Sequence, residues 1–169
     1  MIIIGIDPGV AITGFAVIKK TKGGTENLKV VDFGCIVTSQ SRRTEERLKI
    51  IHEEINSLIK KYRPDLMSIE NIYFFKNLKT AMPVSQARGV IMLSAAQKNV
   101  SICEFTPLQV KMAVAGYGKA EKKQVQKMTK QLFDLSSFDF KDKNRSKDDA
   151  ADALGVALCA AFHRPNIRL

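Results

Sequence analysis

Four acidic residues stand where this sequence could carry out chemistry. Asp7 ends an apolar run at the N-terminus and precedes a Pro-Gly turn, and Glu70 ends a second, shorter apolar run. Asp149 and Asp152 are spaced i, i+3 at the start of an Ala-rich segment, which puts both on one face of a helix. Because acidic residues usually occupy polar faces, carboxylates in apolar surroundings indicate a possible site.

Four carboxylates gathered in a cleft repel one another, and their pKa values rise unless a cation neutralises them. Their oxygen ligands favour Mg²⁺ or Mn²⁺ over zinc or copper. Two such ions, roughly 3.5–4 Å apart, activate a water and stabilise the leaving 3′ oxygen of a phosphodiester. The pattern therefore predicts metal-assisted phosphodiester hydrolysis.

Each acidic residue also has a simpler local interpretation. Asp148 and Asp149 suit the cap of a helix, where they complement its dipole. Asp7 suits a turn with Pro-Gly, and Glu70 suits an ion pair with a lysine. The functional hypothesis depends on the four residues together.

The elements that would position these residues can be read from hydrophobic periodicity. The continuous apolar run 1–6 is typical of a strand buried on both faces. Two further strands, at 12–18 and 28–37, follow through short connections and predict an antiparallel meander. If the strand at 66–69 lies parallel to the first, Asp7 and Glu70 emerge at the same edge of the sheet.

Helical periodicity accounts for most of the remaining chain. We expect helices at 44–62, 78–98 and 148–162, a last strand at 101–105, and only helices and loops after Thr106. This order predicts an α/β fold with a mixed five-stranded sheet covered by helices. The length of 169 residues suits a single domain, 1–169.

The charge distribution points to a polyanionic partner. The chain has a net charge of +10, and residues 107–147 hold ten basic residues against four acidic ones, a net charge of +6. Phosphate backbones bind such surfaces by counterion release, although a solvated helix face is the simpler explanation. Directly after Glu70, the aromatic residues Tyr73, Phe74 and Phe75 suit base stacking or, alternatively, core packing.

The sequence argues against several classes of protein. No apolar run approaches the roughly 20 residues of a membrane span. The three cysteines are far apart in apolar surroundings, which favours buried thiols over disulfides, in a reducing, cytoplasmic compartment. The two histidines lack the patterns of zinc proteases and serine hydrolases. The segment ending at Lys119 lacks the first glycine and the Ser or Thr of a phosphate-binding P-loop.

Six short motifs stand in order and are spread over almost the whole chain. They are Ile6-Asp7-Pro8-Gly9 with Thr13-Gly14, Ile69-Glu70 followed by aromatics, Gln86-Ala87-Arg88-Gly89, Gln109-Val110-Lys111, Gly118-Lys119-Ala120-Glu121-Lys122, and Asp149-Ala150-Ala151-Asp152-Ala153-Leu154. Together these motifs resemble the RuvC family of bacterial Holliday-junction resolvases.

The resemblance implies a ribonuclease H-like fold, with a mixed five-stranded sheet and helices on both faces, in a homodimer. It also implies Mg²⁺-dependent resolution of four-way DNA junctions by symmetric paired nicks, in recombination and repair. Two Mg²⁺ ions are expected per active site, with Mn²⁺ as a substitute. The RuvA–RuvB branch-migration complex is the implied partner.

The resemblance also assigns residues. The catalytic and metal-binding positions match Asp7, Glu70, Asp149 and Asp152. The DNA-binding candidates are Lys111 and Lys122, Lys119 within the same motif as Lys122, and Tyr73, which stands where the family usually has phenylalanine.

The helix at 78–98 is the candidate dimer interface, because Val90, Ile91, Met92, Leu93, Ala95 and Ala96 offer more apolar surface than one helix face can bury. A C2 dimer supplies two active sites to a nearly two-fold substrate. Packing of this helix against the sheet is the alternative.

Three other functions remain open from the residues. An actin-like or sugar-kinase ATPase shares the related sheet but needs a second domain. A DNA-binding module without catalysis has no reason to keep four acids. A nuclease of RNA–DNA hybrids is argued against only by the series of motifs.

Overall fold

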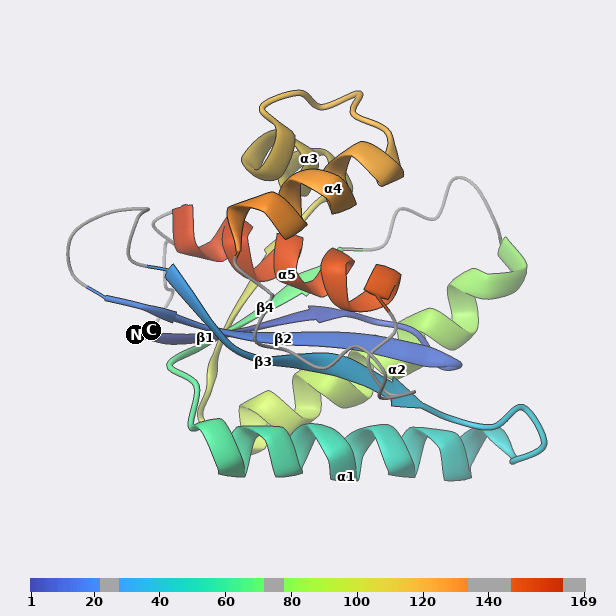
Figure 1. Cartoon of the computed structure of the whole chain (residues 1–169). Coiled ribbons are helices and arrows are strands. Elements are labelled where there is room, and N and C mark those ends of the chain that lie inside the picture. Colours follow the sequence, from blue (N-terminus) through green and yellow to red (C-terminus); the bar gives the residue numbers. More distant parts are fainter. Residues whose placement is uncertain (22–27, 72–77, 134–146, 163–169) are drawn as a thin grey trace.

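The computed structural model describes residues 1–21, 28–71, 78–133 and 147–162, which form an α/β structure around one sheet (Figure 1). Along the chain the elements are β1 (Ile2–Asp7), β2 (Ile12–Lys20), β3 (Leu28–Val37), α1 (Thr44–Tyr62), β4 (Leu66–Glu70), α2 (Leu78–Gln97), β5 (Ser101–Phe105), α3 (Pro107–Ala115), α4 (Lys122–Leu132) and α5 (Lys147–Phe162).

The sheet has the strand order β3-β2-β1-β4-β5. Strands β1, β2 and β3 pair antiparallel, whereas β4 pairs parallel with both β1 and β5. The predicted meander and the parallel neighbours β1 and β4 are thus confirmed. The expected end of the second strand at residue 18 is wrong, because backbone pairing with β1 and β3 continues to Lys20.

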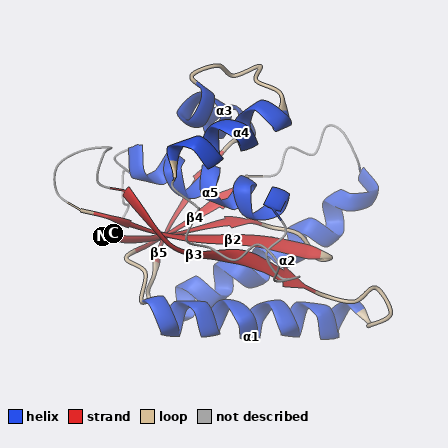
Figure 2. Cartoon of the chain, in the orientation of Figure 1, coloured by secondary structure: helices blue, strands red, loops and turns tan. Residues whose placement is uncertain are grey.

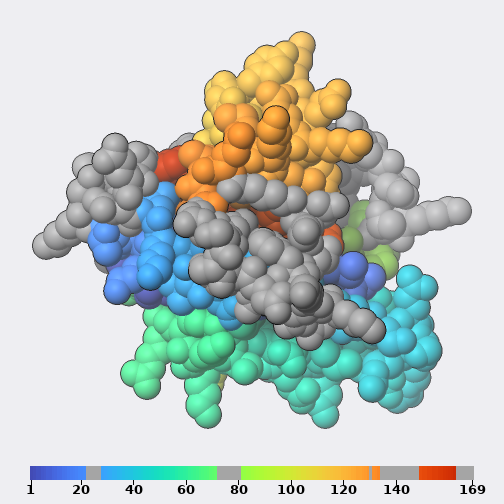
Figure 3. Space-filling model, viewed as in Figure 1, coloured from blue at the N-terminus to red at the C-terminus, as the bar shows by residue number. Residues whose placement is uncertain are grey.

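Helices cover both faces of the sheet (Figure 2). Helices α1 and α2 pack on one face, and α5 packs on the other, with α3 and α4 against α5 (Figure 1). Figure 3 shows α3 and α4, in yellow and orange, as a projection at the top of the molecule. The sheet therefore separates two hydrophobic cores.

Alternation along β1 determines which side chains face α5. Ile4 and Ile6 belong to the core under α1 and α2, whereas Ile3 belongs to the core under α5. Because successive side chains of a strand point to opposite faces, Asp7 follows Ile3 and Gly5 onto the α5 side. Glu70 lies on the same side, two residues after Ser68, whose hydroxyl donates to a carbonyl of α5.

The three cysteines are thiols and form no disulfide, as predicted. Cys35 and Cys159 are buried, and Cys103 is half-buried rather than fully buried. Burial raises the pKa of Cys103 to about 11 and that of Cys159 to about 12, so both remain protonated. Among the described residues, no helix has the length and apolar character needed to cross a membrane.

Candidate active site

Strand β1 delivers Asp7 to the edge of the sheet. The side chains of Ile3, Ile4 and Ile6 are fully buried, which fixes the strand in the middle of the sheet. Ile6 pairs with Ile69 of the parallel strand β4, so Asp7 and Glu70 follow side by side at the carboxyl ends of the two strands. This edge is the usual ligand-binding edge of an open α/β sheet.

Two glycines let helix α5 approach the sheet closely. A Cβ atom at Gly5 would lie 2.4 Å from the carbonyl oxygen of Ala153, and one at Gly14 would lie 2.4 Å from that of Asp149. Both separations are shorter than real Cβ atoms tolerate, so the backbone of α5 rests directly on β1 and β2 at positions where only glycine fits. Because Gly14 pairs with Asp7, the same contact brings Asp149 to Asp7.

The acidic residues meet between these elements. Carboxylate oxygens of Asp7, Asp149 and Asp152 all lie within 4.8 Å of one another. Asp7, Asp152 and Glu70 also line a cleft of about 310 Å³ between the sheet edge, α3, α4 and α5. The structure therefore brings together the four acidic residues that the sequence singles out, from two strands and one helix.

Crowding and burial perturb the acidic groups. Burial, and then the negative charges of Glu70 and Asp152, raise the pKa of Asp7 well above its ordinary value of 3.8. Burial and the charge of Asp152 also raise the pKa of Glu70. Lys122 lowers both pKa values but does not cancel the other effects.

Helix α4 contributes a cation and an amide to the cleft. The Nζ atom of Lys122 lies 2.6 Å from Oδ2 of Asp152, and the Nε2 atom of Gln126 donates to Oδ1 of the same carboxylate at 3.2 Å. The hydrogen bond to Asp152 raises the pKa of Lys122, which keeps its charge. Sequence reasoning missed Gln126, although its i, i+4 spacing from Lys122 puts both residues on one helix face.

Helix α3 contributes Lys111, which lines the cleft. The helix begins with a capping box in which the Thr106 hydroxyl accepts a hydrogen bond from the backbone of Gln109 at 3.2 Å, with Pro107 in the first turn. This start fixes the helix directly after β5, so that Lys111, one turn into it, faces the carboxylates.

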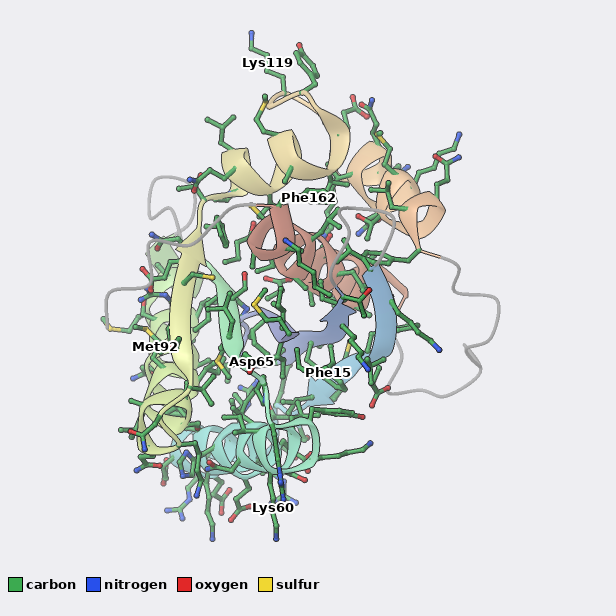
Figure 4. The ribbon with its side chains drawn as sticks, turned by 90° about the vertical axis from the view of Figure 1, so that its left-hand side faces the viewer. Phe15, Lys60, Asp65, Met92, Lys119 and Phe162 are labelled. Atoms are coloured by element: carbon green, nitrogen blue, oxygen red, sulfur yellow. The ribbon has the colours of Figure 1, made fainter. Side chains whose placement is uncertain are left out.

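Of the remaining predicted residues, Lys119 is the one with a described position. Lys119 is exposed at the turn between α3 and α4, and Figure 4 shows it at the top of the molecule, pointing away from the sheet. It is not among the residues that line the cleft. Tyr73 and the side chain of Asp148 lie outside the described residues.

The donor set fits a divalent cation. Every acidic ligand is a carboxylate oxygen, the chemistry that Mg²⁺ and Mn²⁺ prefer. Burial, and then repulsion between neighbouring carboxylates, raise the pKa of Asp7 and of Glu70 even though Lys122 lowers both, so the cleft favours a further positive charge beside these groups. A divalent cation would supply that charge, and Asp7, Glu70, Asp149 and Asp152 are the residues that would hold it.

Comparisons with known proteins agree with this geometry. The family model of "Crossover junction endodeoxyribonuclease RuvC" matches residues 3–160. The RuvC of Halothermothrix orenii is 47% identical over 159 residues, covering 94% of this chain and 91% of its own. The RuvC of Petrotoga mobilis is 46% identical over 168 residues, which cover 99% of this chain and 98% of the relative.

A solved structure extends the similarity to the fold. Thermus thermophilus RuvC in complex with Holliday junction substrate superposes with a TM-score of 0.83 at 29% identity, covering 96% of this chain and 93% of that one. This match confirms the predicted ribonuclease H-like fold. On the matched family model, the relatives and the fold, the chain belongs to the RuvC family of crossover junction endodeoxyribonucleases.

Proposed function

We propose that this protein is a metal-dependent endonuclease that resolves four-way DNA junctions by paired, symmetric nicks in recombination and repair. The observation that carries the proposal is the convergence of the acidic residues on one cleft, in a chain of the RuvC family. The two lysines at the cleft, Lys111 and Lys122, supply the positive charge that attracts a DNA backbone.

Mg²⁺ is the proposed cofactor, with two ions per site and Mn²⁺ as a substitute. Asp7, Glu70, Asp149 and Asp152 would hold it. When bound, it supplies a water of lowered pKa and a positive charge at the leaving 3′ oxygen.

The chain's own groups bind and orient the substrate. Lys122 is 65% exposed although it pairs with Asp152, so its ammonium group reaches both the carboxylates and a phosphate at the mouth of the cleft. Gln126 donates to Oδ1 of Asp152 and keeps that carboxylate oriented when Lys122 turns to the phosphate. Lys111 lines the same cleft and gives a second cation for the scissile phosphate.

Lys119 and Tyr73 are proposed to bind DNA outside the cleft. The exposed position of Lys119 on the projection formed by α3 and α4 suits contact with a DNA arm rather than with the scissile phosphate. Tyr73 follows Glu70 in the sequence, where an aromatic side chain suits stacking on a base.

A homodimer through α2 is supported by the two faces of that helix. Ala87, Ile91 and Ala95 are fully buried against the sheet, whereas Met82 is 70% and Leu93 is 52% exposed on the other face. The buried face suits the core-packing interpretation of this helix, and the exposed apolar side chains support the proposed interface. We expect Leu93→Glu to produce monomers by sedimentation velocity, and Leu132→Glu, at an exposed leucine of α4, to leave the dimer intact. Dimers in Leu93→Glu would exclude this interface.

The cellular setting completes the proposal. Cysteines that form no disulfide, together with a DNA substrate, suit the cytoplasm of a bacterial cell. The RuvA–RuvB complex is the partner that family membership suggests.

The proposal is tested by incubating the purified protein with a labelled four-way junction, a linear duplex and an RNA–DNA hybrid, with Mg²⁺ or EDTA. We expect paired nicks in the junction only, and none with EDTA. Cleavage of the hybrid instead would reassign the substrate. Tight junction binding without cleavage in Mg²⁺ or Mn²⁺ would identify a binding module and refute the proposed activity.

A further inference from the structure

The turn that follows Asp7 is closed by its own hydrogen bonds. The Thr13 hydroxyl donates to the carbonyl oxygen of Gly9 at 2.6 Å, and the Gly9 amide donates back to the same hydroxyl oxygen at 3.4 Å. A Cβ atom at Gly9 would lie 2.2 Å from the carbonyl oxygen of Ile12, so the turn is as tight as glycine allows. The direction in which β1 ends at Asp7 thus depends on how this turn is held.

Thr38, directly after β3, holds the turn from outside. Its hydroxyl donates to the carbonyl oxygen of Val10, and its backbone amide donates to that of Ala11 at 3.0 Å. Thr38 is buried, with 4% of its surface exposed, so water does not replace these bonds. One residue therefore fixes two consecutive carbonyl groups of the turn.

Arg47 completes the arrangement from α1. Its Nε atom donates to Oγ1 of Thr38 at 2.9 Å. Arg47 is the fourth residue of α1, and a cation in the first turn opposes the helix dipole, which the neighbouring Glu45 and Glu46 complement. The contact with Thr38 gives a reason for a cation at this unfavourable position.

The three groups form a directed chain. The guanidinium group donates to the hydroxyl, and the hydroxyl donates to the carbonyl of Val10. A charged donor strengthens its own bond and polarises the next one. Figure 1 shows the segment between β3 and α1 as a cyan loop at the right-hand end of the sheet, beside the start of α1.

We propose that Arg47 and Thr38 are positioning residues for junction cleavage. They hold the turn that follows Asp7, residues 8–12, so that the Asp7 carboxylate stays beside Asp149 and Asp152. In this way they set the affinity of the site for divalent cations. This role rests on the proposed function but concerns groups outside the carboxylate cluster and the residues that line the cleft.

The test uses variants that remove single bonds. Thr38→Val removes the hydroxyl and keeps the shape, Thr38→Ser keeps the hydroxyl, and Arg47→Met removes the donor. Tyr62→Phe is the matched control, because the Tyr62 hydroxyl donates to Asp32 and ties α1 to β3 at the other end of the helix. Each variant is measured for Mn²⁺ binding by calorimetry, for cleavage across an Mg²⁺ series, for junction binding in EDTA, and for melting temperature.

We expect Thr38→Val and Arg47→Met each to weaken Mn²⁺ binding about three- to tenfold, the effect of one hydrogen bond. The half-saturating Mg²⁺ concentration rises by the same factor, and junction binding in EDTA is unchanged. The double variant binds Mn²⁺ no more weakly than the weaker-binding of the two single variants, because both residues act through the same chain of hydrogen bonds. Thr38→Ser stays near the wild type, and Tyr62→Phe lowers only the melting temperature.

The outcomes separate this role from the proposed function. A folded wild-type protein that cleaves no junction refutes the proposed function. Wild-type cleavage with unchanged Mn²⁺ binding in folded Thr38→Val and Arg47→Met overturns the positioning role alone. Equal weakening in Tyr62→Phe also overturns it, because the effect would then be general loosening of α1. If Thr38→Val does not fold, Arg47→Met and Thr38→Ser decide the question.

Discussion

The close contact between Gly14 and α5 gives a quantitative test of how the fold sets the site. In Gly14→Ala the new Cβ atom would lie 2.4 Å from the carbonyl oxygen of Asp149, where ordinary contacts begin at 3.4 Å. The start of α5 must therefore move by about 1 Å, taking Asp149 away from Asp7. Overpacking of this kind costs about 1–3 kcal/mol of stability. A misplacement of about 1 Å slows cleavage about 100-fold.

The assay is single-turnover cleavage of a labelled four-way junction with saturating protein and Mg²⁺, together with melting temperature and junction binding in EDTA. Gly155→Ala is the control on α5 itself, because its Cβ would meet the side chains of Val110 at 3.2 Å and Val114 at 3.4 Å, which can yield. Alanine also improves helix propensity there by up to about 1 kcal/mol. A folded Gly14→Ala that cleaves at the wild-type rate would refute the reasoning.

Three further predictions concern the charges of the cleft. Burial and repulsion raise the pKa of Asp7, so the folded metal-free protein keeps a proton that the unfolded chain has lost. Its stability, measured by thermal melting, should therefore fall as pH rises above about 4, the ordinary pKa of an aspartate. Stability that rises with pH instead would contradict the assigned shift. Asp7→Asn removes this repulsion, so without metal at neutral pH the variant should melt at a higher temperature than the wild type. Added Mn²⁺ should no longer raise its melting temperature. A rise as large as that of the wild type would exclude Asp7 as a ligand. Lys122→Gln removes a cation that lowers the pKa values of Asp7 and Glu70, so protons compete better with metal and the acidic limb of the cleavage profile should move to higher pH. Lys127→Gln, an exposed lysine of the same helix, should leave that limb in place, and an equal shift in both variants would indicate a general charge effect.

The carboxylates could be predicted because strand ends and helix spacing are local properties. Asp7 and Glu70 each interrupt an apolar run, and parallel neighbours bring such residues to one edge. The i, i+3 spacing of Asp149 and Asp152 places them on one helix face before any tertiary contact is known.

Hydrophobic periodicity does not predict contacts between segments that are distant in the sequence. Gly14 was part of a motif, but its purpose appears only when α5 is placed on the sheet. The contact of Arg47 with Thr38 and that of Gln126 with Asp152 depend on tertiary packing in the same way.

Some predictions remain predictions. The structure places Lys119 on the surface, away from the carboxylates, and its part in DNA binding needs a separate test. The single domain spanning 1–169 and the roles assigned to the four acidic residues are likewise predictions that experiments must examine.

The most direct test of the central claim follows Mn²⁺ binding by electron paramagnetic resonance and junction cleavage on the same preparations of wild type and Asp7→Asn. The account predicts that the wild type binds Mn²⁺ and makes paired nicks, whereas Asp7→Asn does neither but still binds the junction in EDTA. Asp7→Asn protein that cleaves at the wild-type rate would contradict it.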